Sequence, residues 1–414
     1  MFERVRKFVN LKNELVKGSF ILLVLFNIVF LLNALFRVIS ARMLEPADYG
    51  LLAALIGLVF LLGAPSEAIQ TIISRYTSKF LNNNEKIKGM FVKSLKRAVV
   101  ISLFCVLIMA ALSGIIGDVL KVDFKYIILI SFFFFGFFIM PSVRGVLQGK
   151  KKFTQLGSSF LIESITKVVL TPLLIMAGLK VYGALGAILF SLAVSFFISL
   201  LFIREILKSK ADNTKIDGIY DYSWPVFISS LCIIAFYSLD IIFAKIFFSA
   251  SDVGMYAAIS DMGKMIFWGT IPISKAMLPI ISEKRDKKAS ARKDIKGALL
   301  LVIGACLIGL IIFALFPEIL LKIFYGVKYL KFSSLLAYFG ISMFFLAITN
   351  IFIYDLMAKG SKESLYLVLF VAIQIVFFML FHANILQFIT ALIASNFLTM
   401  LFFAFVYLSK RKAG

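Results

Sequence analysis

Long apolar stretches alternate with short polar connections along almost the whole chain. A stretch of about 20 mostly apolar residues is long enough to cross a bilayer as a helix. A lipid environment also requires every backbone polar group to be bonded internally, which favours helices throughout. Twelve spans are predicted, over residues 19–41, 49–75, 97–116, 126–146, 157–179, 182–203, 224–248, 253–282, 295–315, 332–355, 364–381 and 385–408.

Lysine and arginine concentrate in every second connection between these spans. The basic connections include residues 79–96, 150–152, 204–215 and 284–288, whereas the connections between them are short and poor in both residue types. An excess of Lys and Arg marks the cytoplasmic side of a multispanning membrane protein. We therefore expect a multi-pass protein of the cell (plasma) membrane with both termini in the cytoplasm.

Composition supports a membrane protein and disfavours other classes. The chain is 61% hydrophobic and its mean hydropathy is +1.00, which is far more apolar than an ordinary soluble domain. The net charge of +22 is spread over separate connections, so it indicates topology and contact with anionic lipids rather than nucleic acid. The short outer connections also leave no room for a catalytic domain, which argues against an enzyme such as a membrane glycosyltransferase.

The residues that usually hold metals are scarce and scattered. The three cysteines each lie in an apolar span, and the single histidine, His382, lies at a helix end. These residues cannot form a conventional zinc site. We therefore expect no metal site and no cofactor.

An internal repeat divides the chain into two halves. Residues 44–54 align without gaps with residues 248–258 and share Asp, Gly and a pair of alanines. We expect the Asp of each copy to cap the helix that follows. Two halves of six spans with the same orientation are related by a two-fold axis along the membrane normal, as in many transporters. The expected organisation is a cytoplasmic segment (1–18), an N-terminal lobe (19–203), a cytoplasmic linker (204–223), a C-terminal lobe (224–408) and a cytoplasmic tail (409–414).

Two short motifs carry a family resemblance. Residues 42–50, RMLEPADYG, resemble the R-x-L-x-P-x-D-Y/F-G turn of polysaccharide-export flippases, and residues 144–149, RGVLQG, resemble their R-G-x-L-Q-G segment. The chain thus resembles the oligosaccharidyl-lipid (Wzx-type) flippases of the MOP superfamily, which includes the MATE exporters. The resemblance implies an all-α membrane fold of two six-helix lobes, in which helices one, two, seven and eight front a central cavity.

Several charged residues lie within the predicted spans. A charge at the centre of a span costs about 2.5–3.5 kcal/mol on insertion scales, so such residues usually face a protein interior or an aqueous cavity. We expect them to mark the substrate-binding cavity. The main candidates are Arg37, Glu67, Asp240, Asp261, Lys264 and Lys275, and the secondary candidates are Glu163, Lys167 and Arg144.

Some of these charges have a structural interpretation. Glu163 and Lys167 are four residues apart on one predicted helix, and Asp261 and Lys264 are three apart, so each pair could form a bridge within its helix. Arg37 and Lys275 have no acidic residue within a turn of their own helices, which favours an anionic ligand such as a phosphate. We also expect Arg37 to pair with Asp240 across the two halves when the outer side is closed.

These observations favour a transporter over an enzyme. The leading hypothesis is a flippase that moves a lipid-linked (polyprenyl-phosphate-type) oligosaccharide from the cytoplasmic to the outer leaflet by alternating access. Its expected partners are this substrate, membrane lipids and other glycan-assembly proteins. The alternative is a MATE-type, cation-coupled exporter of small amphiphilic compounds, in which Glu67 or Glu163 would carry the coupling ion, H⁺ or Na⁺.

Overall fold

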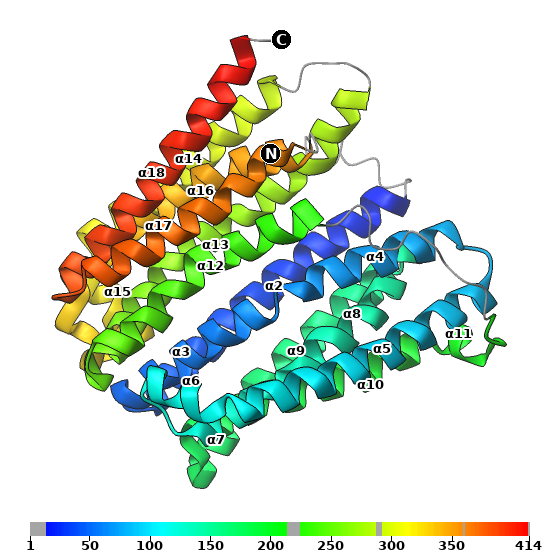
Figure 1. Cartoon of the computed structure of the whole chain (residues 1–414), viewed down its shortest axis with the longest axis horizontal. Helices are drawn as coiled ribbons and strands as arrows, with labels where there is room; N and C mark the ends of the chain where they lie inside the picture. The colour runs from blue at the N-terminus through cyan, green and yellow to red at the C-terminus, as the bar shows by residue number, and fades with distance from the viewer. Residues whose placement is uncertain (1–13, 213–223, 287–291, 359–360, 413–414) are drawn as a thin grey trace. The chain divides into compact units, whose positions relative to one another are not determined.

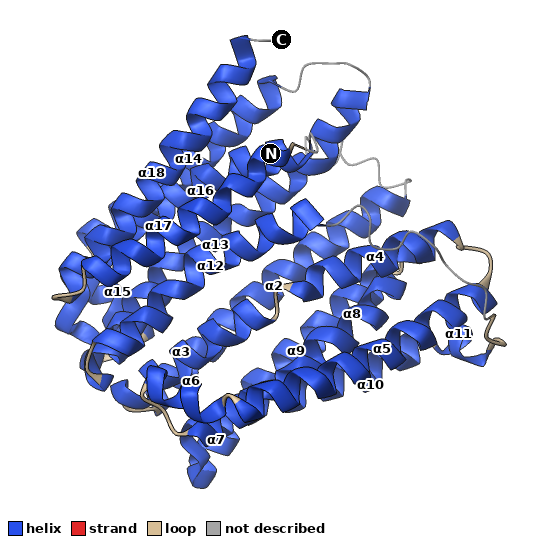
Figure 2. Ribbon diagram, viewed as in Figure 1, coloured by secondary structure: helices blue, strands red, loops and turns tan. Residues whose placement is uncertain are grey.

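In the computed structural model, the residues that are described form helices joined by turns and loops, without a strand (Figure 2). These residues are 14–212, 224–286, 292–358 and 361–412. Within them, ten stretches are long and apolar enough to cross a membrane. The all-α class predicted from the apolar pattern is therefore confirmed.

The chain forms two compact units (Figure 1). The first contains Met1–Leu44 and Leu62–Ser223, and the second contains Glu45–Leu61 and Trp224–Gly414. The helices of the first unit are α2 (Glu14–Met43), α4 (Pro65–Lys79), α5 (Asn84–Ala111), α6 (Ser113–Leu120), α7 (Phe124–Ser131), α8 (Phe133–Gly149), α9 (Phe153–Leu174), the π-helix η1 (Ile175–Leu179), α10 (Lys180–Phe202) and α11 (Arg204–Lys208). Those of the second are α3 (Pro46–Leu62), α12 (Trp224–Phe247), α13 (Ala250–Asp286), α14 (Arg292–Leu315), α15 (Pro317–Phe324), the 3-10 helix η2 (Val327–Leu335), α16 (Leu336–Ala358), the 3-10 helix η3 (Lys362–Tyr366), α17 (Leu367–Leu380) and α18 (Ile385–Lys412).

Residues 45–61 pack with the second unit, whereas the sequence-based division placed them in the N-terminal lobe. Two glycines explain this packing. A Cβ on Gly50 would lie 2.6 Å from the backbone nitrogen of Gly254, and one on Gly57 would lie 2.8 Å from the side chain of Ile241. Small residues let helices approach closely in membranes. The backbone of α3 therefore lies directly against α13, and α3 also contacts α12.

The second predicted span is divided into two helices by this arrangement. Helix α3 ends at Leu62 and α4 begins at Pro65, where proline occupies the first turn. Proline is well tolerated there because its missing N–H would have no partner inside the helix. Since α3 up to Leu61 belongs to the second unit and α4 to the first, the chain passes from one unit to the other at the end of α3.

The ten stretches differ from the twelve predicted spans at two places. The expected fifth and sixth spans lie in one helical stretch, Phe153–Phe202. This stretch is interrupted where Gly178 and Lys180 have positive φ angles of 86° and 43°, and α9 packs against α10. The expected eighth span, α13, is not among the ten. The total of twelve spans stays a prediction.

The R-G-x-L-Q-G motif packs α8 against α4 in the first unit. A Cβ on Gly145 would lie 2.8 Å from the carbonyl oxygen of Gln70, and one on Gly149 would lie 2.5 Å from that of Ser74. The side-chain amide of Gln148 bonds that of Gln70 at 2.9 Å. The two glycines and the glutamine thus have a packing role.

The second copy of the repeat forms the start of α13. Ser249 Oγ accepts the backbone N–H of Asp252 at 3.2 Å and donates to its carboxylate at 2.9 Å. Ser249 therefore caps α13 by accepting this N–H. Asp252, which the sequence suggested as the cap, lies in the first turn of the helix instead. The hydrogen bond from Lys331, at 2.6 Å, is the main cause that holds the pKa of Asp252 below its usual range.

Gly254→Ala tests the close approach of α3 and α13. A Cβ on Gly254 would overlap the carbonyl oxygen of Pro46, and backbone cannot move aside as a flexible side chain can. We expect Gly254→Ala to lower the free energy of unfolding by about 1–3 kcal/mol, measured as thermal unfolding of the purified protein. The matched control is Gly269→Ala on the same helix, where a Cβ would meet open space. Equal stability of the two variants would contradict this packing.

Candidate functional sites

Six charged side chains inside the spans, those of Arg144, Glu163, Lys167, Asp240, Asp261 and Lys264, are buried or partly buried beside polar partners of their own unit. In the first unit these partners lie on α2, α8, α9 and α10, and in the second on α3, α12 and α13. A charge in an apolar environment is costly unless it is paired or hydrogen-bonded. The buried polar contacts of each unit therefore lie on the helices that carry these partners.

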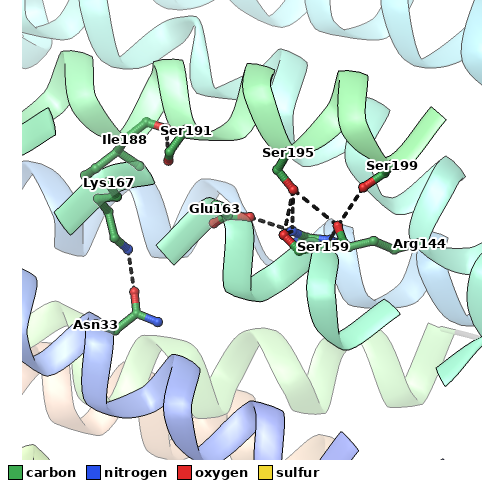
Figure 3. Close-up of polar contacts among 9 residues, drawn as sticks. All are labelled: Asn33, Arg144, Ser159, Glu163, Lys167, Ile188, Ser191, Ser195 and Ser199. Carbon is green, nitrogen blue, oxygen red and sulfur yellow. Dashed lines mark hydrogen bonds and ion pairs between the residues drawn. The ribbon is translucent and has the colours of Figure 1, made fainter. Parts of the chain in front are cut away.

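Arg144 of α8 joins two helices of the first unit (Figure 3). Its Nη2 donates to Glu163 Oε2 at 2.6 Å and its Nε donates to Ser159 Oγ at 3.1 Å. The guanidinium also lies over the ring of Phe160, 3.6 Å from the centroid. The side chains of Arg144 and Glu163 are only 9% and 19% exposed. The two charges thus neutralise each other between α8 and α9.

Three serines extend this network to α10 (Figure 3). Ser195 Oγ donates to the carbonyl oxygen of Ser159 at 2.7 Å, and Ser199 Oγ donates to Ser159 Oγ at 2.9 Å. All three serines are fully buried. The serine hydroxyls therefore connect α9 with α10 by hydrogen bonds inside the first unit.

Lys167 lies one turn further along α9 and has a neutral hydrogen-bond partner. Its Nζ donates to Asn33 Oδ1 on α2 (Figure 3) and lies 5.0 Å from the ring centroid of Phe36. Glu163 pairs with Arg144 rather than with Lys167, so the bridge expected within α9 is wrong. Arg37 lies one turn from Asn33 on the same helix and is partly buried.

Asp240 of α12 is the centre of a second network. Its Oδ1 accepts a bond from Lys264 Nζ at 2.9 Å. Its Oδ2 accepts bonds from Tyr256 OH at 3.1 Å and Ser260 Oγ at 2.7 Å. The side chain of Asp240 is 0% exposed and that of Lys264 is 5% exposed. The carboxylate is therefore neutralised within its own unit.

Asp261, the neighbour of Ser260 on α13, forms a hydrogen bond with a residue of a different helix. Its Oδ2 accepts a bond from Tyr49 OH on α3 at 2.5 Å. The ring of Tyr49 packs against Tyr325 and Tyr329, with centroid distances of 6.1 and 5.7 Å. Asp261 thus hydrogen-bonds Tyr49 of the motif at residues 42–50, whereas Lys264 pairs with the carboxylate of Asp240.

Two further candidates are Glu67 and Lys275. Glu67, in the first turn of α4, has an exposed side chain. Lys275 belongs to α13, but its side chain lies outside the described part of the chain. The pairing of Arg37 with Asp240 stays a prediction, and so does a substrate-binding role for each of the candidates.

Sequence reasoning missed the neutral partners. Tyr256 and Ser260 precede Lys264 at intervals of four, so they share one face of α13, and this spacing could have revealed them. Ser195 and Ser199 have the same spacing on α10. Asn33 has no such signal, because its partner Lys167 is on a helix distant in sequence.

Solved structures with the same fold are transporters. An inward-facing MATE family multidrug resistance transporter of the MOP superfamily aligns with a TM-score of 0.73 at 15% identity, covering 93% of this chain and 96% of that one. A MOP superfamily transporter from Pyrococcus furiosus aligns with a TM-score of 0.67 at 16% identity, covering 96% and 95%. The binding pocket of that transporter has reverse polarity, which suggests a different function for it. The fold is therefore that of MOP superfamily membrane transporters.

Sequence comparison gives the family. The model of the polysaccharide biosynthesis protein family matches residues 15–285, and the chain belongs to this family. An uncharacterized membrane protein of Methanocaldococcus jannaschii is 26% identical over 297 residues, which are 64% of this chain and 69% of that protein. The chain therefore belongs to the polysaccharide biosynthesis protein family and has the fold of MOP superfamily transporters, so the resemblance drawn from the two motifs is confirmed.

Replacing Arg144 and Glu163 tests whether they act as a structural pair. Glu163→Gln or Arg144→Met leaves one buried charge unpaired, and we expect each to lower the free energy of unfolding by about 3–5 kcal/mol. The double variant should lose less than the sum of the two, because neither charge remains. Thermal unfolding of the purified variants measures this.

An exposed ion pair of the same unit supplies the control. Lys152 and Glu205 lie 3.5 Å apart with side chains 28% and 72% exposed, so Glu205→Gln should change stability by less than about 1 kcal/mol. Fully additive losses for Arg144→Met and Glu163→Gln would show that the two side chains stabilise the unit independently.

Proposed function

We propose that this transporter moves a lipid-linked oligosaccharide, of the polyprenyl-phosphate type, from the cytoplasmic to the outer leaflet for surface polysaccharide or glycan assembly. Membership of the polysaccharide biosynthesis family is the observation that carries this proposal. A sugar headgroup cannot cross hydrocarbon unaided, because its hydroxyls would lose their hydrogen bonds to water. The protein supplies polar partners for the headgroup while the lipid tail stays in the bilayer, and no covalent bond changes.

The charges of the first unit support a phosphorylated headgroup. Arg144 is neutralised by Glu163, whereas Lys167 is held by the amide of Asn33. An amide partner orients an ammonium but does not cancel its charge. The Lys167 ammonium on α9 therefore keeps a positive charge that a phosphate can pair with.

The proposal includes the location and direction of transport. The chain lies in the plasma membrane with both termini in the cytoplasm, as the Lys and Arg pattern indicates. Its partners are the lipid-linked substrate, the surrounding lipids and the proteins that assemble the glycan. Transport proceeds by alternating access, in which the two halves change their mutual contacts.

Deletion of the gene tests the proposed substrate class. We expect surface polysaccharide to fall and its lipid-linked precursor to accumulate, because synthesis continues while translocation stops. Both are measured by extraction and chromatography of labelled glycans and lipids. Unchanged glycans together with increased sensitivity to cationic drugs would favour the exporter instead.

Lys167 tests the role of the positive charge. In the deletion strain, Lys167→Met should restore polysaccharide export about tenfold less well than the native gene, the loss expected when a charge-assisted contact is removed. Lys167→Arg keeps the charge and should retain most of the export. The control is Lys125→Gln, which neutralises an exposed lysine at the start of α7. Full export by Lys167→Met at equal membrane abundance would exclude the proposed role of this lysine.

A further inference from the structure

The proposed function leaves two short helices without a role. Helix α6 (Ser113–Leu120) follows α5 in the first unit, and α15 (Pro317–Phe324) follows α14 in the second (Figure 1). Both α5 and α14 begin with several basic residues and end in an apolar run. Because basic residues mark the cytoplasmic side, α6 and α15 lie at the outer ends of these long helices.

Helix α15 has three sides of different character. Leu321 is fully buried, on the side where the helix packs within its unit. Ile319 and Ile323 share a second side, and their side chains are 54% and 58% exposed. Glu318 and Lys322 are also exposed and lie four residues apart on the third side. An exposed apolar side next to a charged side is typical of a helix that lies in a membrane interface.

Exposed apolar residues on α14 lead up to this helix. Helix α14 is apolar enough to cross a membrane, and its side chains of Ile308, Ile312 and Leu315 are exposed at intervals of one turn. Residues 298–315 carry no charge and are roughly 27 Å long at a rise of about 1.5 Å per residue. The hydrocarbon core of a bilayer is about 30 Å thick. Helix α15 therefore begins where the hydrocarbon ends.

The internal repeat produces the same apolar side in the first unit. Under the alignment that matches residue 44 with residue 248, Ile115 of α6 corresponds to Ile319. Val119 corresponds to Ile323 in the same way. Ile115 and Val119 are 65% and 54% exposed, much like their counterparts. Apolar side chains are thus exposed at the same positions of both units.

The charged side differs between the two helices. The residue of α6 that corresponds to Lys322 is Asp118, and both side chains are exposed. The two units therefore have the apolar side in common but not the sign of the charge beside it. Lipid suits this combination, because acyl chains contact any apolar surface, whereas a protein partner also requires matching charges.

We propose that α6 and α15 are interfacial helices, whose exposed apolar sides enter the outer leaflet while their charged residues stay in water. The partner of these surfaces is the upper part of the lipid acyl chains. Each helix then holds the outer end of its unit at a fixed depth in the membrane. This inference goes beyond the transport proposal and holds whichever substrate the protein carries.

A spin label at position 319 tests the proposal in proteoliposomes. Oxygen dissolves in hydrocarbon whereas a polar nickel chelate stays in water, so the label's accessibility to each reports its surroundings. We expect the label on Ile319→Cys to be severalfold more accessible to oxygen than to the chelate. The order should reverse for Lys322→Cys, the matched control on the charged side. The parent protein carries Cys105→Ala, and its remaining cysteines, Cys232 and Cys306, are buried.

The other outcomes distinguish water and protein from lipid. A label at position 319 that meets the chelate as readily as one at position 322 would overturn the proposal, because the apolar side would face water. A label shielded from both probes would also overturn it, since protein would cover the helix. Ile115→Cys and Asp118→Cys repeat the comparison on α6, where the same difference is expected.

Tryptophan fluorescence replaces the spin label if the cysteine variants do not fold. Ile319→Trp adds to the fluorescence of Trp224 and Trp268, which is measured on the native protein and subtracted. Lipids brominated near the headgroup should quench the added fluorescence more strongly than lipids brominated at the chain ends, as expected for an interfacial side chain. Quenching no stronger than that of Lys322→Trp would overturn the proposal.

Discussion

The need to neutralise charge in hydrocarbon organises both units of this protein. Water is absent from the bilayer core, so each buried charge must find a partner within the protein. In the first unit Arg144 finds Glu163, and in the second Lys264 finds Asp240. Each pair is completed by hydroxyls of its own unit, which fix the geometry as well as the charge. These pairs join neighbouring helices, which leaves Lys167, with its neutral amide partner, as the more suitable group for an anion.

Helix packing also explains the motif of residues 42–50, which begins at the end of α2. Gly50 allows α3 to lie against α13, and Tyr49 beside it donates to the buried carboxylate of Asp261. Close backbone approach and a buried hydrogen bond therefore come from adjacent residues. Together they hold α3 in the second unit, although the helix that follows it, α4, packs in the first. The chain thus changes units in the middle of one predicted span.

The apolar pattern predicted the all-helical fold, although not the division of one predicted span into α3 and α4, and two short motifs predicted the family. Partners proved harder to predict because spacing within one helix reveals only neighbours on that helix. Glu163 and Lys167 have the spacing of an ion pair, yet Glu163 bonds Arg144 of α8 and Lys167 bonds Asn33 of α2. Lys264 is likewise close to Asp261 in sequence, yet it bonds Asp240 of α12. Contacts between helices distant in sequence depend on packing that one sequence does not show.

Helix packing and charge pairing thus build a scaffold, and we assign to it the passage of a phosphorylated sugar lipid. The most direct measurement is translocation by the purified protein in proteoliposomes that contain a fluorescent polyprenyl-diphosphate sugar. A membrane-impermeant quencher reports how much label reaches the outer leaflet. We expect quenching to increase with time in vesicles that contain the protein, and to increase more slowly with Lys167→Met. Quenching equal to that of protein-free vesicles would contradict the proposed transport.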